Sequence, residues 1–210
     1  MRSFLKGLAW FAGVIVVLMI AARIFFVKAW RIPDDPTLSA SVAPSIASGD
    51  LVLVLFRGQR EVGDLVRCAH PEDHSRWIVG RIVGVQGDRV KVGTMFVEVN
   101  GRKYRTTEAC VQQHYDITGP GGVENTLSCN RVDFAGSWHF ILSKGGEGRE
   151  SNEVTVGPGR YYLVSDNRYD YWDSRDFGTV PAETCTEKVL FRLWGKEGFF
   201  GSESRFDYLR

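Results

Sequence analysis

The sequence has little of several features that mark common functional classes. Its 26 lysine and arginine side chains nearly balance its 25 aspartate and glutamate side chains, so it lacks the basic excess of a dedicated nucleic-acid-binding protein. It has four cysteines without a C-x-x-C pair or a histidine–cysteine cluster, which argues against a zinc site. It also lacks a glycine-rich phosphate loop, an internal repeat and a low-complexity tract. We therefore expect no metal, no nucleotide or other cofactor, and no nucleic-acid partner.

The charges are unevenly distributed along the chain. Residues 1–30 contain four basic side chains and no acidic one, which leaves 22 basic and 25 acidic side chains in the other 180 residues. In this first part the run LAWFAGVIVVLMIAA (8–22) is uncharged, and apolar residues continue past Arg23 to Val27. Such a length suits a helix that crosses a hydrocarbon core of about 30 Å. We expect a retained transmembrane helix in residues 1–30, with a signal peptide cleaved after Ala22 as the alternative.

The four cysteines are compatible with disulfides if the body of the protein lies outside the cytoplasm. Their number allows three pairings, among which the sequence does not choose. Cys110–Cys129 is our preferred pair, because both residues lie in one glycine-rich excursion of the chain. For Cys68, which follows an apolar stretch, an inert buried thiol is about as good an interpretation as a disulfide.

The body is expected to be mainly β. Short runs rich in valine, isoleucine and aromatic residues recur between turn signals, and Asn100-Gly101 is the strongest hairpin signal in the chain. A short helical turn is expected only within Pro181–Lys188. The expected strands are Leu51–Phe56, Leu65–Cys68, Trp77–Val85, Arg89–Val92, Met95–Val99, Tyr161–Val164 and Val189–Trp194.

Between residues 106 and 159 the strand pattern loosens around glycine-rich segments. We interpret this part as a variable β-rich insert or cap, with a hairpin around Trp138–Leu142. The expected organisation is therefore a membrane anchor (1–30), a first part of the core (31–105), the insert (106–159) and a second part of the core (160–210).

Three stretches carry chemistry: SASVAPSIASGD (39–50), WIVGRIVGVQGD (77–88) and SDNRYDYWDSRDFGTVP (165–181). Each alone is common in β proteins. In this order, behind an apolar N-terminal segment, they resemble type I signal peptidases, the Ser/Lys membrane-bound endopeptidases of family S26. The first follows the family motif S-G-S-M-x-P-T-L-x-x-G-D, and the third follows G-D-N-R-D-N-S-x-D-S-R-x-W-G-x-V-P. GDLV (63–66) and PED (71–73) resemble two further family elements.

The resemblance implies roles for individual residues. Ser41 takes the place of the nucleophile, and its backbone N–H with the Ser39 hydroxyl would form the oxyanion hole. Trp77 and Ile78 fall where the family lines a shallow pocket for small substrate side chains, and Val42 next to the nucleophile is also expected to contact substrate. An extended preprotein segment would add to a sheet edge beside this pocket.

The resemblance also implies a scaffold and a location. Arg81, Asp173 and Arg175 match a cluster of charged residues that holds the third motif against the strand of the second. The expected fold is a signal-peptidase-like β core behind one transmembrane helix. Exported preproteins and the lipid bilayer are the expected partners, and the catalytic domain would lie on the outer face of the cytoplasmic membrane.

One departure from the family pattern concerns the general base. The family's catalytic lysine falls on Gly80, and Arg81 cannot replace it because a guanidinium stays protonated. The serine that supports this lysine falls on Tyr171, whose bulk would fill the volume lost at Gly80. A second departure is an insertion of five residues, DDPTL (34–38), which would lengthen the loop that enters the site.

Three hypotheses address the missing lysine. The Tyr171 phenol acts as the base, which requires a depressed pKa. Alternatively, a lysine or histidine from elsewhere enters the space above Gly80. As a third possibility, the chain is an inactive homologue that binds exported proteins. A specialised peptidase for one pilin-like substrate is also open. The candidates for a base from elsewhere are Lys91, Lys144, His70 and His74.

Overall fold

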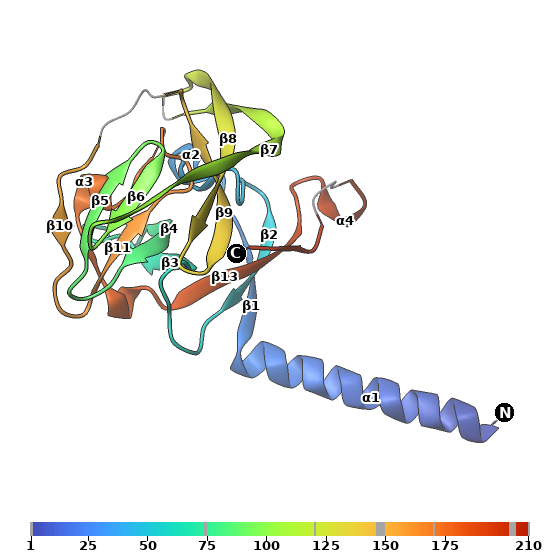
Figure 1. The fold of residues 1–210 in the computed structure, drawn as a ribbon. Helices are drawn as coiled ribbons and strands as arrows, with labels where there is room; N and C mark the ends of the chain where they lie inside the picture. Colours follow the sequence, from blue (N-terminus) through green and yellow to red (C-terminus); the bar gives the residue numbers. More distant parts are fainter. Residues whose placement is uncertain are drawn as a thin grey trace.

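The computed structural model describes residues 2–73, 75–119, 121–145, 150–169, 171–201 and 205–209. The first element, α1 (Arg2–Phe25), is a long helix that projects away from a β-rich body (Figure 1). In the part of the chain that is described, no helix combines the length and the apolarity needed to cross a membrane. The strand β1 (Val27–Arg31) follows directly and joins the body by pairing with β2 (Leu51–Leu55).

The body consists of two antiparallel sheets. The first has the order β1-β2-β13-β3-β4-β11-β12, with β14 also paired to β13, and the second has the order β10-β5-β6-β7-β8-β9. All seven expected strands are present, so the mainly β prediction is confirmed. The strands not yet given are β3 (Leu65–Ala69), β4 (Trp77–Gly84), β5 (Arg89–Gly93), β6 (Phe96–Val99), β7 (Arg102–Thr118), β8 (Glu124–Phe134), β9 (Ser137–Ser143), β10 (Val154–Thr155), β11 (Arg160–Val164), β12 (Val180–Pro181), β13 (Glu187–Trp194) and β14 (Asp207–Tyr208).

The short helices lie in connections between strands. They are α2 (Pro36–Val42), α3 (Ser174–Phe177), the 3₁₀ turn η1 (Ala182–Thr184) and α4 (Gly198–Gly201). The turn η1 confirms the helical turn expected within Pro181–Lys188, although Glu187 and Lys188 already belong to β13. The expectation that the body has a helical turn only there is wrong, because α2, α3 and α4 are helical as well. The expected hairpin at Asn100-Gly101 joins β6 to β7, and both residues have the positive φ that a type I′ turn requires.

The strand β4, which contains most of the second motif, is packed against the core on both faces. Seven of its eight residues are buried, because core side chains cover both faces. Ile78 and Ile82 pack in a cluster with Leu163 of β11, whereas Val79 packs in a separate cluster with Val42 of α2. The strand therefore links the α2 segment on one face to the segment that leads into the third motif on the other.

The insert is more regular than its sequence indicated. β7 and β8 are the longest strands of the body, and β8 and β9 form the hairpin expected around Trp138–Leu142. Most side chains of β7 are exposed, so its sequence lacks the apolar alternation of a half-buried strand. Pairing with β8 rather than local hydrophobicity therefore defines it.

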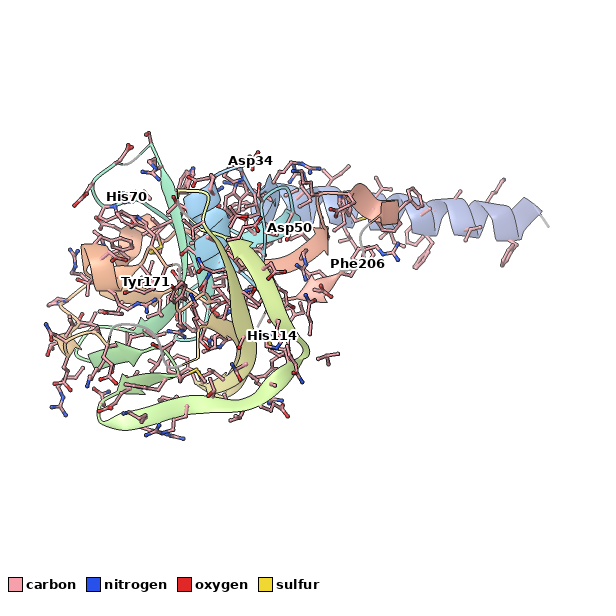
Figure 2. All side chains as sticks on the ribbon, turned by 90° about the horizontal axis from the view of Figure 1, so that it is seen from above. Asp34, Asp50, His70, His114, Tyr171 and Phe206 are labelled. Atoms are coloured by element: carbon pink, nitrogen blue, oxygen red, sulfur yellow. A yellow bond between two sulfur atoms is a disulfide. The ribbon has the colours of Figure 1, made fainter. Side chains whose placement is uncertain are left out.

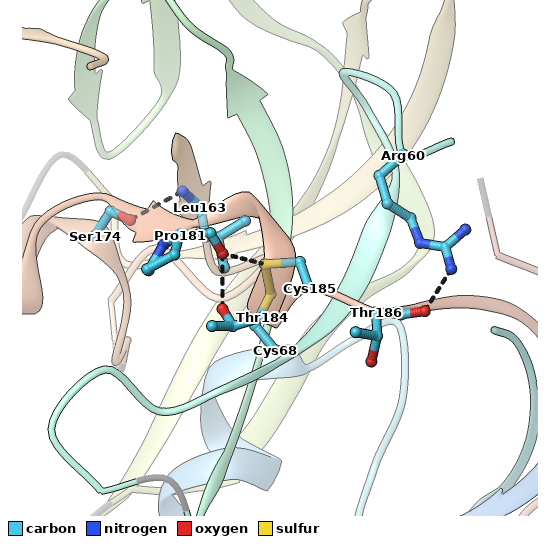
Figure 3. The surroundings of a disulfide bond; sticks show 8 residues. All are labelled: Arg60, Cys68, Leu163, Ser174, Pro181, Thr184, Cys185 and Thr186. Carbon is cyan, nitrogen blue, oxygen red and sulfur yellow. Dashed lines mark hydrogen bonds between the residues drawn. A yellow bond between two sulfur atoms is a disulfide. The ribbon is translucent and has the colours of Figure 1, made fainter. Parts of the chain in front are cut away.

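All four cysteines form disulfides. Cys110–Cys129 joins β7 to β8, which confirms the expected pair. Cys68–Cys185 joins β3 to the residue after η1, so the alternative of a buried free thiol at Cys68 is wrong (Figure 3). Sequence separation concealed this second pair: the two residues are 117 positions apart, and the sheet order brings β3 beside β13.

Candidate active site

The first motif forms the helix α2 and the loop behind it. Asp35 caps the helix, because its Oδ1 accepts the backbone N–H groups of Thr37 (2.9 Å) and Leu38 (3.1 Å), and Pro36 occupies the first helical position. The segment predicted as an inserted loop therefore supplies the start of this helix. Ser41 lies in the last turn and is only 2% exposed.

The third motif holds α2 from the C-terminal side. The Asn167 backbone N–H donates to the Ser41 carbonyl oxygen (3.0 Å), and the Asn167 side-chain amide donates to the Ala40 carbonyl oxygen (2.9 Å). These bonds use carbonyl groups that the end of a helix leaves without intrahelical partners. The backbone around Ser41 is thereby tied to residues more than 120 positions further along the chain.

Two groups contact the Ser41 hydroxyl directly. The Ser165 Oγ lies 2.5 Å from the Ser41 Oγ, and the Trp172 backbone N–H donates to the Ser41 Oγ over 3.3 Å. The Ser165 backbone N–H in turn donates to the Asp173 carboxylate (2.8 Å). Both groups that contact the Ser41 hydroxyl therefore belong to the third motif.

A narrow, mainly apolar pocket opens beside Ser41. Trp77 and Ile78 line it, in the place that the sequence resemblance implied for them. Val42 does not reach the pocket: it is fully buried in the core. Leu38, His70, Val79 and Trp172 complete most of the lining.

The strand edge beside this pocket is open. β3 pairs with residues 77–81 of β4 on one side, whereas β11 pairs on the other side only from Arg81 onward. Within the described chain, the first four residues of β4 have no strand on that second edge. An unpaired edge can bind an extended peptide through its backbone N–H and C=O groups, although residues 78–80 are buried in this structure and only Trp77 is exposed.

The charged residues form two ion pairs, and the buried Arg168 interacts electrostatically with both of them. Arg81 donates to Asp166 through Nε (3.0 Å) and Nη2 (2.8 Å), and Arg175 donates to Asp173 (2.9 and 2.7 Å). Burial raises the pKa of Asp166, but the neighbouring Arg81 more than offsets it and brings this pKa to about 2. Burial also lowers the pKa of His139 well below its usual value, so its 3.8 Å contact with Asp166 is not an ion pair at neutral pH.

The Ser39 hydroxyl lies apart from Ser41. Residues two positions apart on a helix, such as Ser39 and Ser41, differ by about 200° around its axis. The two side chains therefore leave α2 on different faces. The Ser39 Oγ accepts the Ser48 backbone N–H (3.0 Å), within the loop that follows the helix. Its share in an oxyanion hole stays a prediction, as do the other roles that the resemblance implies.

The space beside Gly80 is filled by β11 and not by Tyr171. A Cβ atom at position 80 would lie 3.2 Å from the Leu163 Cβ and 3.5 Å from the Val164 carbonyl oxygen. The Tyr171 ring instead lies against the Arg175 guanidinium, with the ring centroid 3.2 Å from the Arg175 Cζ. Tyr171 and Ser41 line different cavities. The structure therefore does not bring the phenol to the candidate nucleophile.

The other candidate bases lie in different surroundings. Lys91 pairs with Glu150 on the surface (2.8 Å), and Lys144 contacts the Tyr169 hydroxyl (3.4 Å). His74 lies outside the described residues. Of the described candidates, only His70 lines the pocket that also contains Ser41.

Backbone and side-chain donors approach both ring nitrogens of His70. Its Nδ1 accepts the backbone N–H groups of Glu72 and Asp73 (3.1 Å each). The Trp172 Nε1–H donates to its Nε2 over 3.2 Å, and the centroids of these two rings lie 6.0 Å apart (His70 and Tyr171 are labelled in Figure 2). His70 therefore lines the pocket with Ser41, but its hydrogen bonds go to other residues.

Sequence reasoning missed two residues at this site. Ser165 stands where the quoted family motif begins with glycine, and that exchange was the signal that could have identified it. Trp172 occupies a position at which the motif allows any residue, so the motif itself contained no signal. Only the fold shows that its backbone and its ring both face the pocket.

The sequence is similar to a known protein family and to several of its members. The sequence model of a protein family described as "Signal peptidase, peptidase S26" matches residues 5–194. Signal peptidase I of Streptococcus pneumoniae serotype 4 is 27% identical over 203 residues, which cover 92% of this chain and 94% of that protein. Signal peptidase IB of Staphylococcus aureus is 26% identical over 201 residues, 92% and 91% of the two chains. A crystal structure of a signal peptidase I from Enterococcus faecalis shares 18% identity and a TM-score of 0.37, covering 63% of this chain and 97% of that one.

Proposed function

The chain belongs to the signal peptidase family, peptidase S26, and we propose that it removes signal peptides from exported preproteins with Ser41 as its nucleophile. The observation that supports this role is the position of Ser41 at the rim of an apolar pocket, beside an open edge of β4. An extended substrate bound at this edge would place alternate side chains towards the pocket. Trp77 and Trp172 narrow that pocket, so it would accept small side chains.

The reaction that we propose has two steps. The Ser41 Oγ attacks the carbonyl carbon of the scissile bond, the C–N bond breaks, and the proton lost by Ser41 ends on the leaving amine. Water then hydrolyses the acyl-enzyme and releases the signal peptide. The backbone N–H of Ser41, with the Ser39 hydroxyl, is our candidate for stabilising the developing oxyanion.

A second candidate function follows from the atoms around Ser41. Among the described residues, no lysine or histidine nitrogen is hydrogen-bonded to the Ser41 Oγ, and the nitrogens of His70 are hydrogen-bonded to Glu72, Asp73 and Trp172 instead. A serine hydroxyl without a base is a weak nucleophile. This favours, as the alternative, a homologue that binds signal peptides without cleaving them.

Cleavage of a broad panel of preproteins by the purified full-length protein separates the two functions. We expect the parent protein to release signal peptides and Ser41→Ala to release none, with unchanged thermal unfolding as the control for folding. We expect Tyr171→Phe to keep full activity, because Tyr171 and Ser41 line different cavities. Equal binding of a signal peptide by the parent and by Ser41→Ala, without cleavage by either, would instead establish the binding protein.

We also propose that α1 anchors the protein in the cytoplasmic membrane with the body on its outer face. Large apolar side chains are exposed all along this helix, among them Trp10, Val17 and Leu18, and a bilayer would cover them. Basic residues stand near both ends and can reach the headgroups. Two disulfides in the body suit an oxidising compartment. Digestion of the body by protease added outside intact spheroplasts would support this orientation, and protection of the body would contradict it.

A further inference from the structure

Two serine hydroxyl groups meet in the interior beside the pocket. Ser41 is 2% exposed and Ser165 is fully buried, and their oxygens are 2.5 Å apart. They come from segments 124 positions apart, α2 and the residue that follows β11. Contact between two buried hydroxyl groups requires that one donates to the other, since each offers one proton and two lone pairs.

The surrounding backbone fixes both partners. The Ser165 N–H donates to the buried Asp173 carboxylate (2.8 Å), and the Ser41 carbonyl oxygen accepts from Asn167 (3.0 Å). Neither serine can shift without breaking a buried hydrogen bond, which is costly in an interior that excludes water. The fold therefore fixes the separation of the two serine backbones, and only the χ1 rotation of each side chain moves its hydroxyl group.

We propose that Ser165 is a positioning residue for Ser41, an inference that rests on the nucleophilic role of Ser41 proposed above. The Trp172 N–H occupies one lone pair of the Ser41 Oγ. When Ser41 donates its proton to the Ser165 Oγ, its second lone pair stays free and faces the pocket, where the substrate carbonyl would bind. Ser165 holds this orientation and forms no bond to the substrate.

Gly80 is part of the same arrangement. A Cβ atom at position 80 would approach Leu163 and Val164, the two residues that immediately precede Ser165, to 3.2 and 3.5 Å. The contact with the Leu163 Cβ is tight, so that this neighbour would have to give by a few tenths of an ångström, whereas the contact with the Val164 carbonyl oxygen is an ordinary van der Waals contact. The absence of a side chain at position 80 therefore allows β11 to bring Ser165 up to Ser41.

Kinetics test this role through kcat and KM measured separately on a signal-peptide substrate. Ser165→Ala should lower kcat by roughly 10- to 100-fold and leave KM within about twofold, because a misplaced nucleophile affects the reaction more than binding. Ser143→Ala is the matched control: Ser143 is as deeply buried but donates to Met95. An unchanged kcat for Ser165→Ala, or an equal loss for Ser143→Ala, would overturn the proposal.

A double-mutant cycle on unfolding tests the contact without any need for activity. The effects of Ser41→Ala and Ser165→Ala on the unfolding equilibrium constant should not be additive: the effect of the double variant should differ from their product by about 2- to 10-fold, as is typical of a buried hydrogen bond. Additive effects would refute the pairing even in an active enzyme. Non-additivity in a protein without cleavage activity would instead show that the proposed function had failed while the serine pair remained.

Discussion

The buried ion pair of Arg81 and Asp166 lies directly under the candidate active site, and its disruption should be costly. The Arg81 side chain is 1% exposed and that of Asp166 is 0% exposed, and the two share two hydrogen bonds. Asp166→Asn retains the shape of the side chain but removes the carboxylate that neutralises the guanidinium. Breaking a buried pair in this way costs roughly 3–5 kcal/mol in the free energy of unfolding. For a chain of this size, that corresponds to a fall in Tm of roughly 6–20 °C.

An exposed pair of similar geometry provides the control. Asp133 also accepts Nε and Nη2 of an arginine, Arg131 (3.1 and 2.7 Å), but these side chains are 49% and 31% exposed. Asp133→Asn should cost less than about 1 kcal/mol, because solvent screens the pair. Thermal and urea unfolding of both variants would measure the difference. If Asp166→Asn proves no more destabilising than Asp133→Asn, our account of the buried pair is refuted.

The Asp166 carboxylate also determines how the free energy of unfolding is expected to depend on pH. Although burial raises the pKa of Asp166, Arg81 brings it to about 2, below the ordinary value of 3.8. A carboxylate with a depressed pKa stabilises the folded state fully above about pH 4, and this contribution is lost as the pH falls through about 2. The contribution of the Asp166 carboxylate to the free energy of unfolding amounts to roughly 2 kcal/mol. The difference in unfolding free energy between the parent and Asp166→Asn should therefore shrink between pH 4 and pH 2, and a constant difference would contradict the assignment.

Three further predictions concern the pocket, the core and the covalent links. Trp172→Ala should widen the pocket and raise the relative rate for substrates with larger side chains in a panel of signal peptides, whereas unchanged selectivity would exclude Trp172 from the lining. Gly84→Ala should destabilise the fold by about 1–3 kcal/mol in urea unfolding, because its Cβ would overlap with the Val90 Cγ2. Cys185→Ser should cost roughly 2–5 kcal/mol by opening a long loop, and a Tm equal to that of the parent would show that Cys68–Cys185 adds nothing to stability.

Local chemistry was sufficient to predict much of the core. Strands such as β4 and β13 are runs of β-branched and aromatic residues between turn signals, and the pattern reflects their burial. The Asn100-Gly101 turn needs positive φ at both positions, and Asn-Gly is a preferred residue pair for such a turn. Such elements are predictable because their causes lie within a few residues.

The long strand β7 was not predictable in this way. Its side chains are mostly exposed, and pairing makes it a strand: β6 pairs with its first residues, and β8, 11 residues long, pairs with the rest. Cys68–Cys185 was concealed for the same reason, since the order of strands in the sheet brings the two cysteines together. The partners of these elements are distant in sequence and close only in space.

By itself, the sequence determined the β-rich class, the segments that form the site and the absence of a lysine at position 80, because motif spacing and residue type are written in the chain. The tertiary structure decided which side chains meet there. It placed Ser165 against Ser41 and turned Tyr171 towards Arg175. It also directed the Ser39 hydroxyl to the Ser48 backbone. These contacts depend on helix phase and on where β11 ends, and both are set by packing across more than 100 residues rather than by any local pattern.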